Sequence, residues 1–479
     1  MKSWLLRAEA PRPAPVRDNP YAPWFVVATV CIGAFMGQLD ASIVTIALPT
    51  MQRAFGATLA GVEWVALAYL IVLVSLVAPI GRLADMAGRK ILYLIGFALF
   101  VIGSALCALA PGLLALDAAR ACQAVGAAML QANSVALIAH AVPRLQLGRA
   151  LGIQAAAQAV GLGLGPSAGG ALLELGDWRL IFWINVPIGI VALALGWLLL
   201  PRSRDLADAT PFDWTGMVLF VPAIACALGA LSLLSESAAV AALLGCGALV
   251  LGGAFTAWER RAAHPMVDFA LLAERAFSLG LVAALLAYAT MFGTLFIVPF
   301  FLLRALGVGP GAAGLQLTAL PVALGLTAPL AGYLADRFGL RRLTTGGMAF
   351  TVAGLALLIA GRDATATRVV ALALIGAGLG AFTPSNNTAI MRAAPPQGAG
   401  AAGGVINMTR GLGTSIGVAL CGSIYAFAQL HAAHASSESG FILTVLALMV
   451  LSTVAALAAL ARGPVRPAGD RSRAGRIPQ

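Results

Sequence analysis

The chain has 479 residues, of which 60% are hydrophobic and 10% charged, and its mean hydropathy is +0.93. Soluble globular proteins are typically about 45–50% apolar and about 25% charged, so this composition excludes a soluble protein, a disordered chain and a disulfide scaffold. The net charge of +11 comes from 30 basic and 19 acidic residues. The bases are spread between apolar runs, whereas nucleic-acid-binding proteins gather them on one face. The sequence therefore predicts a membrane protein whose partner is the lipid bilayer and that binds no nucleic acid.

The apolar runs are long enough for helical spans, at about 20 residues per crossing. The run from Trp24 to Leu48 is too long for a cleaved signal peptide, so we expect it to remain as the first span. Strands are excluded because the runs exceed barrel strands in length and do not alternate. Fourteen spans are predicted at 24–48, 60–80, 91–110, 112–138, 150–175, 179–200, 214–234, 238–258, 277–303, 311–334, 343–361, 366–391, 401–429 and 440–461.

The distribution of Lys and Arg predicts the orientation of these spans. With the N-terminus in the cytoplasm, the cytoplasmic stretches hold 23 of the 30 bases and the outside loops hold five. Cytoplasmic loops of membrane proteins carry an excess of Lys and Arg. Both termini are therefore expected in the cytoplasm, which requires an even number of crossings.

An internal repeat appears at an offset of 251 residues. The stretch 81–88, GRLADMAG, returns at 332–339 as GYLADRFG, each time at the predicted cytoplasmic end of the second span of a half. Gly161-Leu162-Gly163 returns at 411–413, at the nearly equal offset of 250 residues. Two six-helix halves separated by two inserted helices explain both echoes, and internal repeats around a central site are typical of secondary transporters.

Several chemistries are disfavoured by what the sequence lacks. The six cysteines lie in apolar runs without a CxxC pattern, and the four histidines show no metal-ligand spacing, so we expect no metal site. No GxxxxGK[ST] loop is present, which argues against ATP hydrolysis. The predicted loops are mostly under about 20 residues, which disfavours a membrane-embedded enzyme such as a glycosyltransferase.

Six short motifs appear in a characteristic order along the chain. They are Leu39-Asp40-Ala41-Ser42 through Pro49, Gly81 to Lys90, Arg120 to Gly126, Gly165-Pro166-Ser167-Ala168-Gly169-Gly170, Trp178-Arg179 through Gly189, and His264-Pro265 with Asp268. Together they resemble the major facilitator superfamily, and within it the fourteen-helix drug:proton antiporter family of the EmrB/QacA type. The resemblance covers roughly residues 24–461.

This resemblance implies an all-α major facilitator fold of fourteen transmembrane helices, built as two six-helix repeats plus two inserted helices. The expected divisions are a cytoplasmic tail at 1–23, a six-helix bundle at 24–200, the two linker helices and a cytoplasmic loop at 201–276, a second bundle at 277–461 and a cytoplasmic tail at 462–479.

The candidate proton-coupling residues are Asp40, Arg120 and Asp117. Asp40 lies eight residues before Leu48, about 12 Å below the outer end of its span at 1.5 Å per residue, and Arg120 reaches a similar depth on the fourth span. An ionisable residue at that depth generally marks a pathway or relay, although a purely structural ion pair is the alternative. Asp117, one turn outward from Arg120, is a rival partner. Glu63 is expected to be either an ordinary charge at the outer rim or a first acceptor of protons.

The polar residues predicted to line a substrate cavity are Gln123, Asn133, Asn387, Asn407 and Arg410. Arg410 has two equally weighted interpretations: it binds anionic groups of the substrate, or it donates hydrogen bonds to backbone carbonyls. The tenth span lacks acidic residues, whereas some relatives that export cationic dyes carry them there. This difference favours neutral or weakly acidic lipophilic substrates.

Two sets of residues are candidates for conformational roles. The gating-loop set is Gly81, Asp85, Gly88, Arg89 and Asp336, in which small residues let helix ends approach and Asp85 can pair with Arg89 or cap a neighbouring helix. The alternative is a charged turn that only sets topology. The antiporter-motif set is Gly161, Gly165, Pro166, Gly169 and Gly170. Its four-residue glycine spacing permits close packing and a bend, and a hinge role is implied only by the resemblance.

The sequence thus predicts a proton-coupled exporter of amphipathic drugs or other toxic small molecules, located in the bacterial inner membrane, with no cofactor beyond the proton gradient. Its partners would be these small molecules and protons, and a periplasmic adaptor protein is left open. The alternative on the same fold is a dedicated exporter or importer of a single metabolite. We expect no enzymatic activity.

Overall fold

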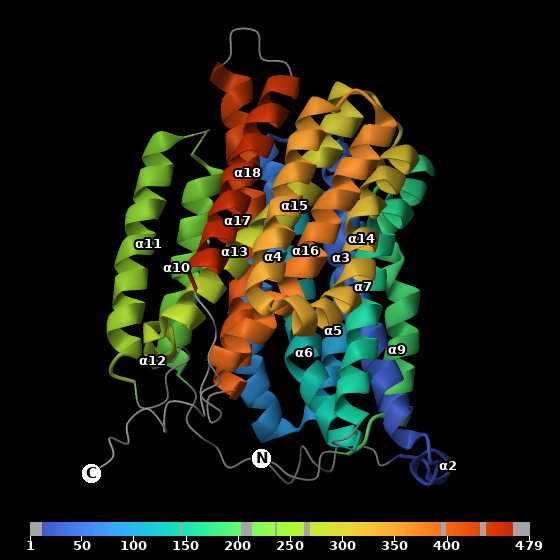
Figure 1. Cartoon of the computed structure of the whole chain (residues 1–479). Coiled ribbons are helices and arrows are strands. Elements are labelled where there is room, and N and C mark those ends of the chain that lie inside the picture. The colour runs from blue at the N-terminus through green and yellow to red at the C-terminus, as the bar shows by residue number, and fades with distance from the viewer. Residues whose placement is uncertain are drawn as a thin grey trace, which may run out of the picture. The chain divides into compact units, whose positions relative to one another are not determined.

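The computed structural model describes residues 12–143, 146–202, 213–234, 237–262, 269–393, 399–431 and 437–462, and the regular elements within these ranges are all helices (Figure 1). By its internal contacts the chain divides into two compact units. Unit 1 is Met1–Phe255 with Pro299–Thr318, and unit 2 is Thr256–Val298 with Ala319–Gln479.

Most of the first half of the chain forms unit 1. Its helices are α2 (Ala14–Arg17), α3 (Ala22–Phe55), α4 (Leu59–Ala87), α5 (Arg89–Leu109), α6 (Leu113–Ala141), α7 (Leu147–Glu174), α8 (Leu180–Trp183), α9 (Asn185–Leu199), α10 (Trp214–Ser232) and most of α11 (Ala238–Glu259). The end of α13, a π-helical turn η2 (Phe301–Ala305) and the first nine residues of α14 also belong to it.

Unit 2 contains the remaining elements. They are α12 (Phe269–Ala273), most of α13 (Arg275–Phe300), most of α14 (Pro310–Phe338), α15 (Leu340–Ala360), α16 (Thr365–Ala393), α17 (Ala399–His431) and α18 (Ser437–Ala461).

Each of the fourteen predicted spans overlaps helical residues, and the span predicted at 179–200 is divided into α8 and α9. The all-helical character is confirmed for the described residues. Among the described residues, thirteen helices are long and apolar enough to cross a membrane. The remaining predicted span, 150–175, corresponds to α7, which has 28 residues. Its many Gly and Ala residues and its glutamines make it less hydropathic than the others.

Glycines at helix ends show the repeat in the backbone itself. Gly88 (φ 106°) separates α4 from α5, and Gly339 (φ 84°) separates α14 from α15, at the same offset of 251 residues. Gly56 (φ 57°) ends α3, and Gly307 (φ 62°) follows η2 at that offset as well. Because a side chain at positive φ is strained, glycine at these four positions is a requirement of the turn.

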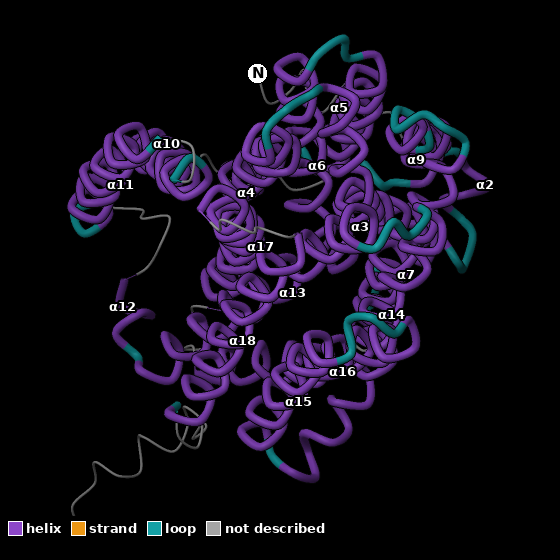
Figure 2. The backbone as a smooth tube through the Cα atoms, turned by 90° about the horizontal axis from the view of Figure 1, so that it is seen from above, coloured by secondary structure: helices purple, strands orange, loops and turns teal. Residues whose placement is uncertain are grey.

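Glycines also set the packing of the corresponding helix pairs α5–α6 and α15–α16. A Cβ atom at Gly103 would lie 2.5 Å from the Cα of Gln123 on α6, and one at Gly354 would lie 2.8 Å from the backbone nitrogen of Ile375 on α16. Such separations are far below van der Waals contact, so only glycine lets these helix backbones approach so closely. Gly103 and Gly354 again differ by 251 positions. In the view along the helices, each pair lies side by side (Figure 2).

Candidate functional site

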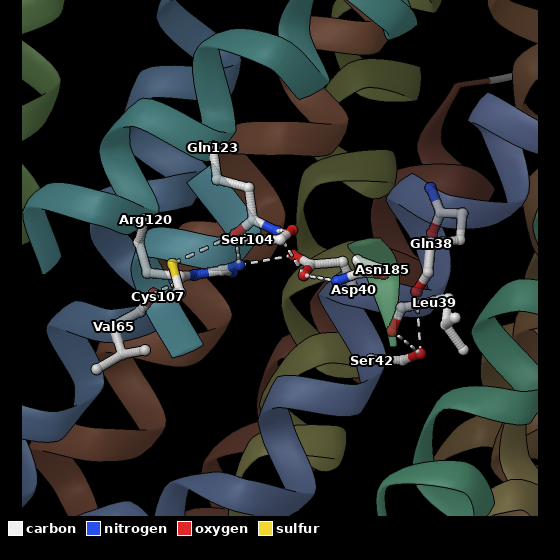
Figure 3. A network of polar contacts seen from close by, with 10 residues as sticks. All are labelled: Gln38, Leu39, Asp40, Ser42, Val65, Ser104, Cys107, Arg120, Gln123 and Asn185. Atoms are coloured by element: carbon white, nitrogen blue, oxygen red, sulfur yellow. Dashed lines mark hydrogen bonds and ion pairs between the residues drawn. The ribbon is translucent and has the colours of Figure 1, made fainter. Parts of the chain in front are cut away.

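A polar network lies in the interior of unit 1 around Asp40 (Figure 3). Asp40 is near the middle of α3, between Leu39 and the run from Ile43 to Leu48, and its side chain is 0% exposed. A buried carboxylate is tolerated only when it is paired and hydrogen-bonded. Helices α3, α5, α6 and α9 supply the side chains that meet this requirement.

Both oxygens of the Asp40 carboxylate accept hydrogen bonds. Oδ2 forms an ion pair with Nη1 of Arg120 at 2.6 Å. Oδ1 accepts from Nε2 of Gln123 at 2.8 Å and from Nδ2 of Asn185 at 2.9 Å. The Gln123 amide nitrogen also donates to Oγ of Ser104 at 2.7 Å, which links α5 to the network. This arrangement suits an ionised carboxylate because every recorded neighbour is a donor.

The Arg120 guanidinium is held from several sides. It donates from Nε to the carbonyl oxygen of Val65 at 3.0 Å and from Nη1 to Oε1 of Gln123 at 2.5 Å. The ring of Tyr69 lies 4.2 Å from its Cζ and the ring of Phe182 lies 5.7 Å from it, both within cation–π distance. The arginine is 1% exposed, so its position depends on these contacts and on Asp40.

The charges of Asp40 and Arg120 cancel, so the network as a whole is electrically neutral. Each buried charge is stabilised by the other. Removing one partner of a buried ion pair typically costs about 3–5 kcal/mol because the other charge stays behind unpaired. A proton delivered to Asp40 would have the same local effect, since it would remove the negative charge that holds Arg120. The state of the network therefore depends on whether Asp40 carries a proton.

The alternative partners named from the sequence lie elsewhere. Asp117 is half-buried on α6, and within the described residues the ion pair of Arg120 is with Asp40. Glu63 is 0% exposed, which contradicts the expectation of an ordinary rim charge. Its Oε2 accepts a hydrogen bond from Oγ of Ser232 at 3.3 Å, so it lies at the contact between α4 and the inserted helix α10. The sequence could not show this burial because α10 lies 150 residues further along the chain.

The antiporter-motif glycines of α7 pack against the helix that carries Asp40. Gly161 faces the carbonyl of Phe35, Gly165 faces the side chain of Ser42, and a Cβ atom at Gly169 would lie 2.6 Å from Ile46. Ser42 in turn donates to the carbonyl of Gly161 at 3.4 Å. These three glycines therefore let α7 pack closely against α3, and one of the contacts, at Ser42, is two residues away from Asp40.

The remaining members of this motif contact the first turns of α14, which belong to unit 1. A Cβ at Gly170 would collide with the carbonyl of Pro310, and the carbonyl of Pro166 faces Gly314. Glu174 at the end of α7 accepts a hydrogen bond from the backbone nitrogen of Gly311 at 3.0 Å. The motif thus packs on two helices at once.

The gating-loop residues lie where α4 meets α5 and where α14 ends. Gly88 is the turn residue with positive φ, Arg89 is the first residue of α5, and Gly81 lies in α4 with nothing near its Cα that a side chain would meet. The side chains of Asp85 and Asp336 lie outside the described residues. The pairing or capping contact of Asp85 therefore stays a prediction.

Three of the predicted cavity residues fall in unit 2. Asn387 of α16 and Arg410 of α17 are each partly exposed. Asn407, one turn before Arg410, is exposed. In unit 1, Gln123 belongs to the Asp40 network, whereas Asn133 is buried further along α6 and donates to the carbonyl of Met129 at 2.8 Å.

Sequence reasoning missed one residue of the Asp40 network. Asn185 belongs to one of the sequence motifs, but its contact with Asp40 spans 145 positions. The signal that could have found Asn185 is its polar side chain inside an apolar span, which must find a partner there.

Comparisons with known proteins agree with this architecture. The family profile of the Major Facilitator Superfamily matches residues 30–258 and 280–478. The chain is 34% identical over 406 residues to the riboflavin transporter RibZ of Clostridioides difficile, covering 84% of this chain and 88% of the relative. It is 33% identical over 400 residues to the multidrug resistance protein Stp of Mycobacterium tuberculosis, covering 82% and 74%.

Solved structures show the same fold. A bacterial homologue of the human lysosomal transporter Spinster, in an inward-facing and unoccupied conformation, superimposes with a TM-score of 0.68. The alignment covers 93% of this chain and 97% of that one, at 16% sequence identity. From the family match, the two relatives and the helical architecture together, the chain belongs to the major facilitator superfamily and is a multi-pass membrane transporter.

Proposed function

We propose that this transporter exports amphipathic small molecules in exchange for protons, as a member of the fourteen-helix drug:proton antiporter family. The observation that carries the proposal is the fully buried Asp40, whose carboxylate is bound by Arg120, Gln123 and Asn185. An intramembrane carboxylate within reach of a single arginine is suited to bind a proton in one state and the arginine in the other. The relative Stp, named for multidrug resistance, supports the export role.

The coupling cycle follows from the bonds of this network. With Asp40 ionised, Arg120 is held in place and the network is closed. A proton on Asp40 cancels the attraction to Arg120, and the arginine then relies on Val65, Gln123 and the ring of Tyr69. Exchange then requires substrate to bind the ionised state of Asp40 more tightly than the protonated state, because a ligand shifts an equilibrium only by its difference in affinity for the two states.

Asn185 is positioned to respond to that change. Its Nδ2 donates to Asp40, while its Oδ1 is buried without a hydrogen-bond partner among the described residues. Rotation of the amide by half a turn would exchange the two atoms, and Oδ1 would then accept a hydrogen bond from protonated Asp40. The amide can therefore satisfy the carboxyl group in both protonation states.

The decisive experiment uses purified protein in lipid vesicles with an imposed pH gradient. A panel of cationic, neutral and anionic amphiphiles is tested for flux that the gradient drives. The proposal predicts gradient-dependent flux of several unrelated amphiphiles and loss of the gradient dependence in Asp40→Asn. Flux that ignores the gradient in the wild type would overturn the proton-coupled mechanism.

The second candidate function is transport of a single metabolite, which the similarity to RibZ favours. The same vesicles separate the two. If one compound is transported and unrelated amphiphiles neither compete with it nor move, the dedicated transporter is correct. The proposed location is the bacterial inner membrane with both termini in the cytoplasm, which labelling of single cysteines introduced near the two ends would test.

A further inference from the structure

The last helix of unit 2 is followed by a buried arginine that the proton-coupling mechanism does not use. Arg462 comes directly after α18 and is 6% exposed. An arginine near the C-terminus of a helix can donate to the last carbonyls of that helix. Arg462 instead donates from Nη1 to the side-chain Oδ1 of Asn386 on α16 at 2.7 Å. Its recorded side-chain partner therefore belongs to a neighbouring helix and not to its own.

The neighbours of Arg462 position its guanidinium. Asn386 donates from Nδ2 to the carbonyl oxygen of Gly280 on α13 at 2.9 Å, so residues of three helices of unit 2 meet at this asparagine. A Cβ atom at Gly280 would lie 3.3 Å from Nη1 of Arg462 and 2.5 Å from Cγ1 of Ile390. The glycine therefore leaves room for the guanidinium beside α13.

Two of the three guanidinium nitrogens are not used within the protein. Nε and Nη2 of Arg462 are buried and have no hydrogen-bond partner among the described residues. Burial lowers the pKa of Arg462 to about 10, so the side chain is still a cation at neutral pH. Buried charged groups are normally paired and hydrogen-bonded. Two unsatisfied donors on a buried cation therefore indicate a ligand that supplies acceptors.

These two nitrogens are the pair best suited to an oxyanion. Nε and Nη2 share one edge of the planar guanidinium, where their N–H groups form a fork. Such a fork binds a carboxylate or a phosphate through two parallel hydrogen bonds. Asn386 occupies Nη1, which is not part of this edge. The edge is covered in this structure, and rotation of the long side chain at the helix end would bring it to the membrane surface.

The position of Arg462 indicates which oxyanion is within reach. The apolar span Glu438–Ala461 ends at the residue before it, so Arg462 lies where the hydrocarbon core meets the lipid headgroups. The distribution of Lys and Arg predicts that this end of α18 faces the cytoplasm. The cytoplasmic leaflet carries anionic phospholipids, and basic pockets between helices on that side bind their headgroups.

The same end of unit 2 carries further positive charge. Arg275 is the first residue of α13 and Arg392 lies in the last turn of α16, and both are exposed. The acid beside them in the sequence is Glu274, so the excess of charge at these helix ends is positive. An anionic headgroup is attracted to such a surface, which brings its phosphate close to Arg462.

We propose that Arg462, oriented by Asn386, binds the phosphate of an anionic phospholipid of the cytoplasmic leaflet through Nε and Nη2. The bound lipid joins the ends of α16 and α18 through one headgroup. The site involves neither Asp40 nor the transported compound, so it goes beyond the proposed exporter function. A negative result for proton coupling would leave it unaffected.

The test uses the purified full-length protein in a neutral detergent, titrated with phosphatidylglycerol, and native mass spectrometry measures the fraction of protein that retains the lipid. We expect Arg462→Gln to weaken this binding by about tenfold or more, the order expected for the loss of hydrogen bonds to a charged group. Arg462→Lys keeps the charge without the fork and should bind with intermediate affinity. Arg392→Gln is the matched control and should stay within about twofold of the wild type, because an exposed charge contributes little.

Thermal unfolding gives a second measurement on the same samples. Phosphatidylglycerol should raise the unfolding temperature of the wild type, as any ligand of the folded state does, and Arg462→Gln should lose most of this shift. Phosphatidylcholine and inorganic phosphate at the same concentration should each produce a much smaller shift. The first lacks the net negative charge, and the second lacks the acyl chains that hold a lipid at the membrane surface.

Three outcomes would overturn the proposal. The first is equal binding of phosphatidylglycerol by the wild type and Arg462→Gln. The second is an equal loss in Arg462→Gln and Arg392→Gln, which would show that only the overall charge attracts the lipid. The third is a full shift from inorganic phosphate alone, which would make the ligand a soluble phosphate and not a lipid.

Asn386→Ala keeps the test decisive if Arg462→Gln does not fold. It removes the group that orients the guanidinium and leaves every charge in place. Its binding of phosphatidylglycerol should fall severalfold, and unchanged binding would contradict the site.

Discussion

Each of the two units has an arginine within a long helix, and the two arginines differ in exposure and in their recorded partners. Arg120 in unit 1 is 1% exposed and faces the carboxylate of Asp40 at 2.6 Å, so its cluster is neutral and closed. Arg410 in unit 2 is partly exposed, and within the described residues no ion pair is recorded for it. The first arginine is neutralised by a buried acid, whereas the second has no recorded acidic partner in the described part of the chain.

The scaffold around these arginines is repeated, but the chemistry is not. Turn glycines and packing glycines recur 251 positions apart, as Gly88 and Gly339 or Gly103 and Gly354. At the same offset Asp40 corresponds to Met291. The duplicated residues named here are therefore glycines that the backbone needs, whereas the carboxylate of the buried network belongs to one half only.

The largest expected effect is that of Asp40→Asn. This substitution keeps the size of the side chain and removes the group that can exchange a proton at this depth. We expect proton-driven exchange to fall by about a hundredfold or more, and the protein to remain in the membrane. Gradient-driven flux in vesicles measures the effect.

Asp117→Asn is the matched control for this prediction. It lies on α6 one turn from Arg120 and is outside the network around Asp40. We expect its flux to stay within about threefold of the wild type. If Asp117→Asn abolished the coupling and Asp40→Asn retained it, the roles assigned to the two acids would be reversed.

The second effect compares the arginines by stability. Arg120→Gln leaves Asp40 buried without a cation, and we expect a loss of about 3–5 kcal/mol in the free energy of unfolding. Arg410→Gln leaves no buried acid behind and should change stability by less than about 1 kcal/mol. Thermal unfolding of the two purified variants, at equal detergent and lipid, gives the comparison. Equal destabilisation by both would show that the surroundings of the two arginines do not differ in charge balance.

A third prediction concerns the glycines of α7 that pack against α3. Gly165→Ala adds a methyl group where the side chain of Ser42 already lies, and overpacking of this kind typically costs about 1–3 kcal/mol. Gly152→Ala on the same helix adds a methyl group with nothing within 4 Å, and should be neutral or slightly stabilising. Unfolding temperatures of the two variants measure the difference. An unchanged unfolding temperature in Gly165→Ala would mean that α3 and α7 are not in close contact at Gly165.

Among the variants tested by flux, a smaller effect than that of Asp40→Asn is expected for Asn185→Leu. It removes one hydrogen bond to the Asp40 carboxylate, and bonds to charged groups contribute about 1.5–3 kcal/mol. We expect proton-driven flux to fall by about tenfold. The matched control is Asn133→Leu, which removes a buried asparagine of unit 1 whose recorded hydrogen bond among the described residues stays within its own helix. A larger effect on flux from the control than from Asn185→Leu would contradict the role given to Asn185.

The sequence predicted the helical spans well because each span must bury about 20 apolar residues, a signal that is local and strong. It also paired Asp40 with Arg120 as one of two alternatives, by matching their depths. Depth says nothing about which helix faces which, so the choice against Asp117 required the packing of α3 on α6. For the same reason the contacts of Asn185 with Asp40 and of Glu63 with α10 were not predicted.

The account depends most on Asp40 being the group that releases a proton when substrate binds. This is measured by adding a transported amphiphile to purified protein in weakly buffered solution and following the pH. We predict that the wild type and Asp117→Asn release protons, and that Asp40→Asn releases none while still binding the amphiphile. Proton release from Asp40→Asn equal to that of the wild type would contradict the account.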